Sequence, residues 1–545
     1  MDSLFQENEA LENSKLRKRK KKRESEPRFK EYNQAQMMLL PPSLEDLIPK
    51  NHLVRVVNRV IGEMNIEALI KTYKGGGRSA YDPQMMLKVL VYAYVMKIYT
   101  SRRIAKALRE DVNFMWLSGM QRPDFRTINN FRSSRLKNVI NKIFRSMIIF
   151  LDKNRYIKLE NYFIDGTRIE ANANKYSYVW SGNTKRYKKI VEVKIKELLK
   201  RIDEINEEED KLYGDKDLEE LGEEAEEISS EKVKEEVKRL NEIIEEIGKD
   251  KDTKKDKKRK EISKAIEQLN KKLIPKLEKY EQQEKKLKGR GSYSKTDEDA
   301  TFFKTKSGQI VPAYNVIVGS EEQLIINYSI HQKPTEADGL IVHIKKLEET
   351  TLGKKPRRII GDAAYGSEEN YRYIEKLGIE NYLKYGSFYQ EQKGKIKKDR
   401  YHKNNFIYNE REDKYYCPEG KSLEFYDEKE YINVSGYKQR ARIYKGTECK
   451  DCKFLELCSK SKEGRTIQIN KDLEKYKKKA RENLLSPLGK ELRKQRNVDI
   501  ETIFGDIKQN QGFRRFNLRG IDKVNVEFGL VAMSHNIKKI GLMAS

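Results

Sequence analysis

The chain has 545 residues, enough for two to four domains at about one domain per 150 residues, and it carries 114 Lys and Arg against 86 Asp and Glu. The net charge of +28 favours nucleic acid as a partner, because neutralising phosphates releases condensed counterions. No apolar run approaches the roughly 18 residues of a membrane span and no apolar signal segment is present, which argues against a membrane or secreted protein and predicts a cytoplasmic one.

The first 38 residues are polar and strongly basic, since every residue from Lys15 to Arg23 except Leu16 is Lys or Arg. This composition predicts a disordered arm, which either follows a phosphate backbone or serves only as a solubilising tail. In residues 39–153 the apolar residues recur at helical intervals, which predicts an all-helical domain.

Two helix starts in this domain, capped by Thr100 and by Asp124 or Thr127, are followed by basic residues and suggest a helix-turn-helix DNA reader. An ordinary helical bundle with a basic surface is the alternative, because such patterns also arise by chance. The residues of this domain that we expect to contact DNA are Arg102, Arg103, Arg126 and Arg132.

Residues 188–288 consist almost wholly of Glu, Lys, Ile and Leu, with apolar residues alternating three and four apart as in a heptad seam. This pattern predicts a coiled-coil insertion. Breaks near Gly214 and from Gly248 to Lys260 favour an antiparallel hairpin or a small bundle over one long rod. A dimerising zipper and a solvated helical spacer both fit the composition.

The segments on either side of the insertion, 154–187 and 289–400, predict an α/β domain with a mixed five-stranded sheet. The expected elements in chain order are strands at 162–165, 309–318, 324–330, 358–362 and 379–384, with helices at 336–347 and 367–377.

Asp165 ends the first of these strands and Asp362 ends the fourth. In a mixed sheet with right-handed crossovers the two strands can be neighbours, and their carboxylates then converge. Each Asp taken alone could equally be a turn or a helix cap.

The C-terminal helices, residues 466–545, supply a third carboxylate. Residues 499–508 predict a helix with one apolar stripe, and Glu501 and Lys508, seven residues apart, share another face. Asp499 is a competing carboxylate that points about 200° away from Glu501 around the helix axis.

All four cysteines lie in residues 401–465, a Lys- and Tyr-rich insertion. They are Cys417, Cys449, Cys452 and Cys458, in the pattern Cys-x31-Cys-x2-Cys-x5-Cys. This spacing favours one structural Zn²⁺ held by four thiolates, and unliganded cysteines or a redox pair are the alternatives.

Three blocks of the chain resemble the signature blocks of bacterial insertion-sequence DDE transposases. They are IDGTRIEANANK (164–175), GDAAYGS (361–367) and ETIFGDIKQNQGFRRFNLRG (501–520). The resemblance spans nearly the whole chain and implies a ribonuclease H-like α/β core behind a helical N-terminal domain. It also implies a DNA transposase that cuts at the ends of an insertion sequence and joins those ends to target DNA.

By this resemblance, Asp165, Asp362 and Glu501 are the catalytic residues and hold two Mg²⁺ (or Mn²⁺) ions, with Asp165 shared by both. Such a pair of ions can bind nucleophile and leaving group from opposite sides of a phosphodiester. Hard carboxylate oxygens are suitable ligands for Mg²⁺. By the same resemblance Arg496 and Lys508 contact phosphates near the cut. Arg514, Arg515 and Arg519 alternate with aromatic residues, which fits either a surface that grips DNA ends or a packed core with a solvated edge. Trp180 could stack on a flipped base, although a packed core tryptophan is the favoured interpretation.

The resemblance is incomplete at one point. Arg496 lies five residues before Glu501, and no tyrosine precedes it at the interval usual in the family, so a hairpin-forming excision pathway is not implied as firmly as cutting. The implied partners are double-stranded DNA, both terminal inverted repeats and target, and a second copy of the chain in a synaptic homodimer. The implied location is the bacterial nucleoid. A catalytically inactive or non-joining DNA-binding protein or nuclease is the alternative.

Overall fold

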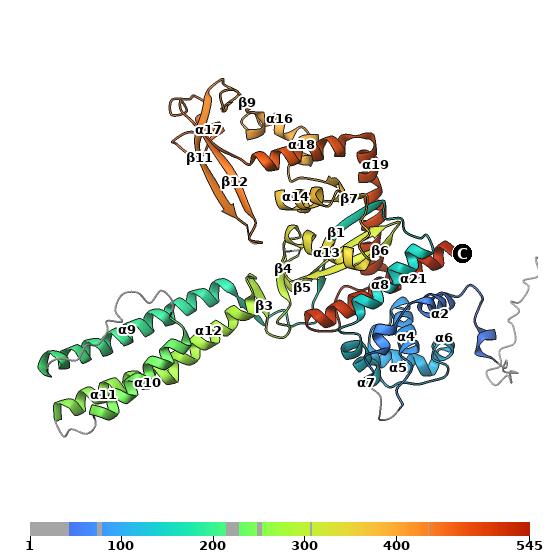
Figure 1. Ribbon diagram of the computed structural model, residues 1–545, viewed down its shortest axis with the longest axis horizontal. Coiled ribbons are helices and arrows are strands. Elements are labelled where there is room, and N and C mark those ends of the chain that lie inside the picture. The colour runs from blue at the N-terminus through green and yellow to red at the C-terminus, as the bar shows by residue number, and fades with distance from the viewer. Residues whose placement is uncertain are drawn as a thin grey trace, which may run out of the picture. The chain divides into compact units, whose positions relative to one another are not determined.

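The computed structural model describes residues 43–73, 79–213, 228–247, 253–305, 308–433 and 435–544 (Figure 1). The expected basic arm, residues 1–38, lies outside them. The chain divides into two compact units, Met1–Leu47 and Ile48–Ser545. In the first unit the described element is a short 3-10 turn, η1 (Leu44–Leu47). All elements named below belong to the second unit.

The N-terminal part of this second unit is helical, as the apolar spacing indicates. Its central helix, α4, is buried along nearly its whole length, because α2 packs against it and so does the C-terminal helix α21. The elements are α2 (Leu53–Glu63), α3 (Glu67–Ile70), α4 (Pro83–Val95), α5 (Ser101–Glu110), α6 (Val112–Leu117), α7 (Phe125–Asn130), the π-turn η2 (Phe131–Arg135) and α8 (Ile140–Lys153).

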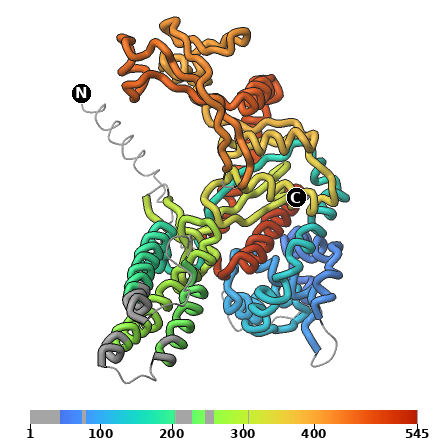
Figure 2. Tube along the Cα trace, turned by 60° about the vertical axis from the view of Figure 1, so that its left-hand side comes forward, coloured from blue at the N-terminus to red at the C-terminus, as the bar shows by residue number. Residues whose placement is uncertain are grey.

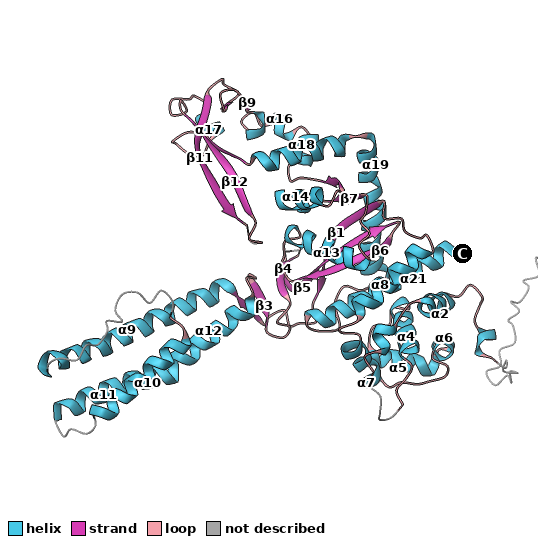
Figure 3. Cartoon of the chain, in the orientation of Figure 1, coloured by secondary structure: helices cyan, strands magenta, loops and turns pink. Residues whose placement is uncertain are grey.

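The α/β part contains a mixed sheet of six strands, one more than expected (Figure 3). The strands are β1 (Asn161–Glu170), β4 (Thr301–Lys304), β5 (Ile310–Glu321), β6 (Leu324–His331), β7 (Arg358–Gly361) and β8 (Glu380–Leu383). Their order is β4-β5-β1-β7-β8, and β6 also pairs with β5. The strands β1, β7 and β8 are parallel to one another, whereas β5 is antiparallel to β1.

Two expected helices lie between strands: α13 (Leu340–Thr350) connects β6 to β7, and α14 (Glu368–Lys376) connects β7 to β8. The long helix α21 (Ile521–Ala544) packs against both α4 and β6. Figure 2 shows α21 in red between the blue helical part and the yellow strands. The C-terminal helix therefore joins the helical part to the sheet. Among the described residues, no helix combines the length and the apolarity that crossing a bilayer requires.

The insertion folds back on itself (Figure 1). Its helices are α9 (Ser181–Tyr213), α10 (Ser230–Ile247), α11 (Thr253–Gln268), the π-turn η3 (Leu269–Leu273) and α12 (Ile274–Leu287). Apolar residues of all these helices form one core, and α12 packs against α9. At the base, β2 (Tyr178–Trp180) pairs with β3 (Ser292–Ser294).

The Cys-containing segment forms a second, antiparallel sheet of five strands, for which the sequence analysis predicted no elements. The strands are β9 (Ile407–Asn409), β10 (Lys414–Tyr416), β11 (Ser422–Ile432), β12 (Lys438–Gly446) and β13 (Thr466–Ile469). A nearly continuous helical stretch follows, made of α18 (Lys471–Leu485), α19 (Pro487–Arg496), the π-turn η7 (Asn497–Glu501), α20 (Thr502–Gly505) and the π-turn η8 (Asp506–Asn510).

Candidate active site

Asp165 and Asp362 come from neighbouring parallel strands. The last paired residues of β1 and β7 are Ile164 and Gly361, so the two aspartates follow at matching positions. This confirms that the first and fourth expected strands are adjacent. One detail of the expectation was wrong, because Asp165 does not end its strand: β1 continues to Glu170 through its pairing with β5.

Glu501 is connected to Asp165 through the guanidinium of Arg496. One Nη atom of Arg496 lies 2.8 Å from Oδ2 of Asp165, and the other lies 3.3 Å from Oε1 of Glu501. The Asp165 side chain is 19% exposed, whereas that of Glu501 is 54% exposed. A single buried cation therefore holds together two carboxylates that are more than 300 residues apart in the chain.

The π-turn η7 explains how Arg496 and Glu501 meet. In a regular α-helix, residues five apart point about 140° away from each other. The wider π-turn spans Asn497–Glu501 and carries Glu501 back toward the side on which Arg496 lies. Such turns occur often at functional sites.

Asp499, the competing carboxylate, faces a different part of the molecule. Its Oδ1 accepts a hydrogen bond of 2.6 Å from the Ser320 hydroxyl, and its Oδ2 accepts one of 3.1 Å from the Gln323 backbone N–H. Burial raises the pKa of Asp499 to about 6. Asp499 therefore anchors the helix to the β5–β6 turn, and Glu501 is the carboxylate that faces Asp165.

The segment after η8 is attached to the far end of β1. The Glu170 N–H donates to the Arg514 carbonyl at 3.0 Å, and the Phe516 N–H donates to the Glu170 carbonyl at 2.9 Å. The strand that carries Asp165 and the chain that carries Glu501 are thus hydrogen-bonded directly.

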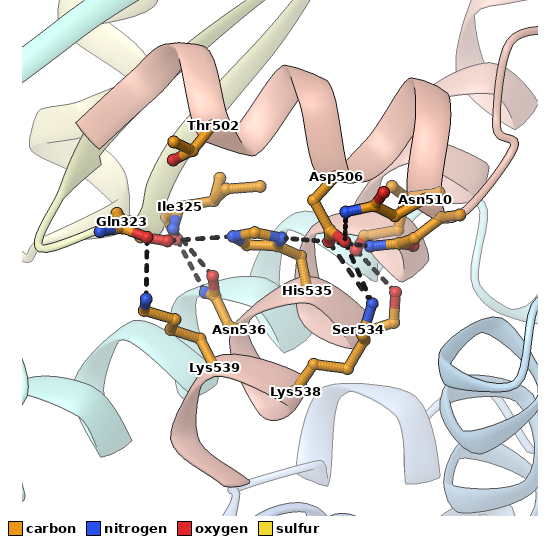
Figure 4. A network of polar contacts seen from close by, with 12 residues as sticks. Gln323, Ile325, Thr502, Asp506, Asn510, Ser534, His535, Asn536, Lys538 and Lys539 are labelled. Atoms are coloured by element: carbon orange, nitrogen blue, oxygen red, sulfur yellow. Dashed lines mark hydrogen bonds and ion pairs between the residues drawn. The ribbon is translucent and has the colours of Figure 1, made fainter. Parts of the chain in front are cut away.

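A polar network fixes the Glu501 helix from its other side (Figure 4). His535 of α21 lies with Nδ1 3.0 Å from the Asp506 carboxylate and Nε2 3.0 Å from the Gln323 carbonyl. Next to it, Asn536 makes two hydrogen bonds of 2.8 Å with the backbone of Ile325. Burial opposes the ionisation of Asp506, but hydrogen bonds from His535 and Gln511 keep its pKa well below the ordinary value. Helix α21 therefore binds the Glu501 helix and the β5–β6 turn together.

Two residues that the sequence analysis missed also belong to this site. The carboxyl group of Glu336, just before α13, lies so close to Gly166 that a Cβ there would stand 2.5 Å from its Cδ. The buried Lys384, which follows β8, places its Nζ 3.5 Å from Oδ1 of Asp362. Neither residue has a periodic sequence signal, although Glu336 stands where the expected helix begins.

The pKa values of these acidic groups are shifted by burial and by the charges of their neighbours. Burial raises the pKa of Asp165, Arg496 lowers it, and the charges of Asp362 and Glu501 raise it further. Burial also raises the pKa of Glu336, and the Asp165 charge adds to the effect. Four carboxylates therefore interact at one place, where Arg496 contacts Asp165 and Glu501, Lys384 contacts Asp362, and Arg168 lowers the pKa of Glu336.

These residues fit a divalent cation by their chemistry, because Mg²⁺ and Mn²⁺ prefer carboxylate oxygens. Within the described ranges, no three His, Cys, Asp or Glu side chains are already arranged to hold a metal. At the triad, the Arg496 guanidinium contacts one carboxylate oxygen each of Asp165 and Glu501.

The expected DNA contacts of the helical part divide into two groups. Arg102, Arg103 and Arg126 are exposed, and the guanidinium groups of Arg102 and Arg126 lie over the Phe125 ring. Arg132 is 3% exposed, and its guanidinium donates to the Tyr99 carbonyl at 2.6 Å. In this structure Arg132 is a buried residue whose charge is compensated inside the fold, and its expected contact with DNA stays a prediction.

Near the Glu501 helix, the arginines that we expect to contact DNA donate hydrogen bonds to backbone carbonyl groups in this structure. Arg515 donates to the carbonyls of Ala171 and Ala173, and Arg519 donates to that of Asn172. These arginines fix the loop after β1 and keep the rest of their guanidinium groups exposed. Arg514 donates to the Lys508 carbonyl, and the Lys508 side chain is half-buried.

Trp180 is half-buried at the base of the insertion. Its ring centroid lies 6.1 Å from that of Phe302 and 5.7 Å from that of Tyr178. The ring is therefore part of a small aromatic cluster.

The four cysteines are free thiols that gather near one end of the second sheet. Cys417 and Cys458 pack against its apolar core, and a Cβ at Gly446 would collide with Sγ of Cys449. Burial raises the pKa of Cys458, Arg465 opposes the rise, and the other three thiols add to it. The thiols are thus near one another, without forming a closed metal-binding group in this structure.

Two family models match the chain. A model described as "Transposase DDE domain" matches residues 416–541, which include Glu501, and one described as "Transposase domain (DUF772)" matches residues 42–134 in the helical part. Comparison with curated proteins and with solved structures gave no match. Over these two segments the chain is similar to transposase families, and both matches support an insertion-sequence DDE transposase.

Proposed function

We propose that the protein cuts DNA at the ends of an insertion sequence and joins those ends to target DNA. The observation that supports the proposal is that Asp165 and Asp362 follow the paired residues of two neighbouring parallel strands, while Arg496 contacts both Asp165 and Glu501. The strand order, with the three parallel strands β1, β7 and β8 beside the three antiparallel strands β4, β5 and β6, supports a ribonuclease H-like core.

In this proposal Asp165, Asp362 and Glu501 hold two Mg²⁺ or Mn²⁺ ions. The ions supply charge stabilisation and an activated oxygen nucleophile at a phosphodiester. The chain's own residues orient and shield the site: β1 and β7 align the aspartates, α21 fixes the Glu501 helix, and Lys384 lies beside Asp362. Arg496 is suited to bidentate contact with a phosphate once its own carboxylate partners are occupied.

The proposed partners are the terminal inverted repeats of the element and a target duplex. The exposed Arg102, Arg103 and Arg126 are the proposed contacts of the helical part, and salt-sensitive binding is expected because such contacts go to phosphates. A homodimer is the proposed synaptic form, since two ends are processed together. The four cysteines are proposed to hold one structural Zn²⁺.

The test uses DNA carrying the ends of the element, a target plasmid and Mg²⁺ or Mn²⁺. Asp165→Asn, Asp362→Asn and Glu501→Gln should each reduce cleavage by more than about 100-fold, beyond the loss for outer-shell partners of a metal site. DNA binding should persist in all three variants, and Asp499→Asn is the matched control that retains cleavage.

The outcome of this assay distinguishes a transposase from a nuclease and from an inactive DNA-binding protein. Cleavage that survives all three substitutions contradicts the proposal at these residues. Cleavage without joined products in the wild type indicates a nuclease. Binding without any cleavage, under conditions in which the fold is intact, indicates an inactive DNA-binding relative.

A further inference from the structure

Arg496 has an unusual position for a residue that is expected to contact DNA. Its side chain is only 6% exposed, and its guanidinium lies between two carboxylates that the proposed function gives to metal ions. A buried cation is tolerated only when opposite charges compensate it, and here Asp165 and Glu501 do so. The ion pair is therefore what stabilises both the arginine and the closely spaced acids in the absence of other ligands.

The hydrogen-bonding capacity of Arg496 is only partly used. Its two Nη atoms contact the carboxylates, whereas its Nε is buried and has no hydrogen-bond partner. A buried donor without a partner is unfavourable and calls for an acceptor that the protein alone does not provide. The Nε–H can thus donate to a further anionic oxygen, such as that of a phosphate.

A divalent ion held between Asp165 and Glu501 would compete with Arg496 for these two carboxylates. A carboxylate oxygen has more than one lone pair, so the competition comes mainly from charge: a guanidinium 2.8 Å from Asp165 and 3.3 Å from Glu501 repels a second cation at the same place. Binding of the ion is therefore expected to weaken the present contacts of Arg496.

We propose that Arg496 is the internal counter-ion of the metal-free site. It keeps Asp165 and Glu501 together, competes with the divalent ions, and leaves these carboxylates when the ions bind. This inference rests on the proposed function, because it assumes that the two carboxylates are metal ligands. It has one direct consequence: DNA, whose phosphates offer Arg496 another anionic partner, raises the affinity for the ions, and the ions raise the affinity for DNA by the same factor.

The first test is Mn²⁺ binding to the DNA-free full-length protein, measured by electron paramagnetic resonance. Arg496→Gln should bind Mn²⁺ at least about tenfold more tightly than the wild type, because a competing positive charge is removed from beside the ion. Lys494→Gln removes an exposed positive charge from the same helix and should leave Mn²⁺ affinity unchanged. Equal or weaker binding by Arg496→Gln overturns the proposal.

Arg496→Lys is a second variant, in case Arg496→Gln does not fold. It keeps the positive charge but cannot contact Asp165 and Glu501 at the same time through two nitrogen atoms. Its Mn²⁺ affinity should lie between those of the wild type and Arg496→Gln. If the lysine variant binds Mn²⁺ no more tightly than the wild type while Arg496→Gln is misfolded by circular dichroism, the competition idea fails.

The second test adds a short duplex of element-end DNA to the wild type. DNA should raise Mn²⁺ affinity in the wild type and have a smaller effect in Arg496→Gln, and an equal effect in both contradicts the coupling. Adding Asp165→Asn or Glu501→Gln to the Arg496→Gln variant must abolish the tight Mn²⁺ binding. If it does not, the metal assignment in the proposed function is wrong. If it does, but Arg496→Gln binds like the wild type, only the role of Arg496 is wrong.

Discussion

Arg496 lies five residues before Glu501, yet its guanidinium contacts that carboxylate at 3.3 Å. The spacing departs from the family pattern by sequence, and the π-turn Asn497–Glu501 compensates for it in space. In this structure the wider turn brings the two side chains onto one face of the helix.

Glu336 is predicted to take part in organising the carboxylate site. Glu336→Gln keeps the size of the side chain but removes its charge beside Asp165, and cleavage should fall by about 10–100-fold, as for outer-shell partners of metal ligands. Gly166→Ala should cause a similar loss, because its Cβ would displace the Glu336 carboxyl group, the mobile end of that side chain. Steady-state cleavage rates check both.

The two substitutions should not add, since they act on the same group. Gly505→Ala is the control for the change of residue type, because an added Cβ there meets no atom within 4 Å. Full activity of Gly166→Ala, or independent losses in the double variant, would show that Glu336 is only a neighbour of the site.

Arg126 and Arg132 are predicted to respond in opposite ways to substitution. Arg126→Ala removes an exposed charge, so DNA affinity should fall and the slope of log affinity against log salt should decrease by about one phosphate contact, without loss of stability. Arg132→Met leaves the buried Glu527 without its nearest positive charge, so the free energy of unfolding should drop by about 3 kcal/mol or more.

Fluorescence anisotropy at several salt concentrations and urea unfolding separate the two effects. A stable Arg132→Met variant with weakened DNA binding would show that Arg132 contacts DNA and does not stabilise the core. A destabilised Arg126→Ala variant would place that arginine in the core instead.

The strands that carry Asp165 and Asp362 could be predicted because short runs such as Tyr162–Ile164 are apolar, buried and followed by a carboxylate. Their adjacency was one arrangement that right-handed crossovers allow, and the register confirms it. The sixth strand, β4, was missed because a run of four residues carries too little periodicity. The second sheet was missed because the long strand β11 is mostly exposed and polar, so its residues do not alternate between apolar and polar.

The site itself was only partly readable from sequence. A helical period of 3.6 residues cannot reveal a π-turn, so neither the pairing of Arg496 with Glu501 nor the inward turn of Arg132, which lies in η2, was visible. Glu336 and Lys384 reach the site from loops at strand and helix ends, where position depends on tertiary packing.

The four cysteines provide a prediction about a metal other than the catalytic one. Protein purified without chelator should contain about one Zn²⁺ per chain by atomic emission, and Cys449→Ser or Cys452→Ser should lose it. Loss of zinc should expose the second sheet to thermolysin, because four thiols then lose the ligand that ties their loops together. Ser459→Ala, next to Cys458, is the control that should keep the metal.

The redox and unliganded alternatives have different signatures. A disulfide lowers the mass of the intact chain by about 2 Da relative to the reduced protein, whereas four titratable thiols without bound zinc indicate plain cysteines. Either result, in protein expressed with sufficient zinc, contradicts the zinc proposal and leaves the carboxylate site untouched.

Asp499 is predicted to make stability depend on pH in the acid range. Its folded pKa of about 6 is higher than its ordinary value of 3.8, because burial disfavours the charged form. At pH values below 3.8, Asp499 is protonated in both the folded and the unfolded state, so it does not lower the free energy of unfolding. As pH rises from about 4 to 6 the unfolded state ionises first, so stability falls, and above 6 the loss is complete and constant, at most about 3 kcal/mol.

Asp499→Asn cannot ionise, and the difference in unfolding free energy between it and the wild type isolates this effect. The difference should move in favour of the variant as pH rises from 4 to 6 and then stay level, as measured by urea unfolding at half-unit steps. A constant offset at all pH values is expected from the lost hydrogen bonds to Ser320 and Gln323, and it does not affect the slope. A slope of opposite sign would mean that these hydrogen bonds outweigh burial and keep Asp499 ionised in the folded protein.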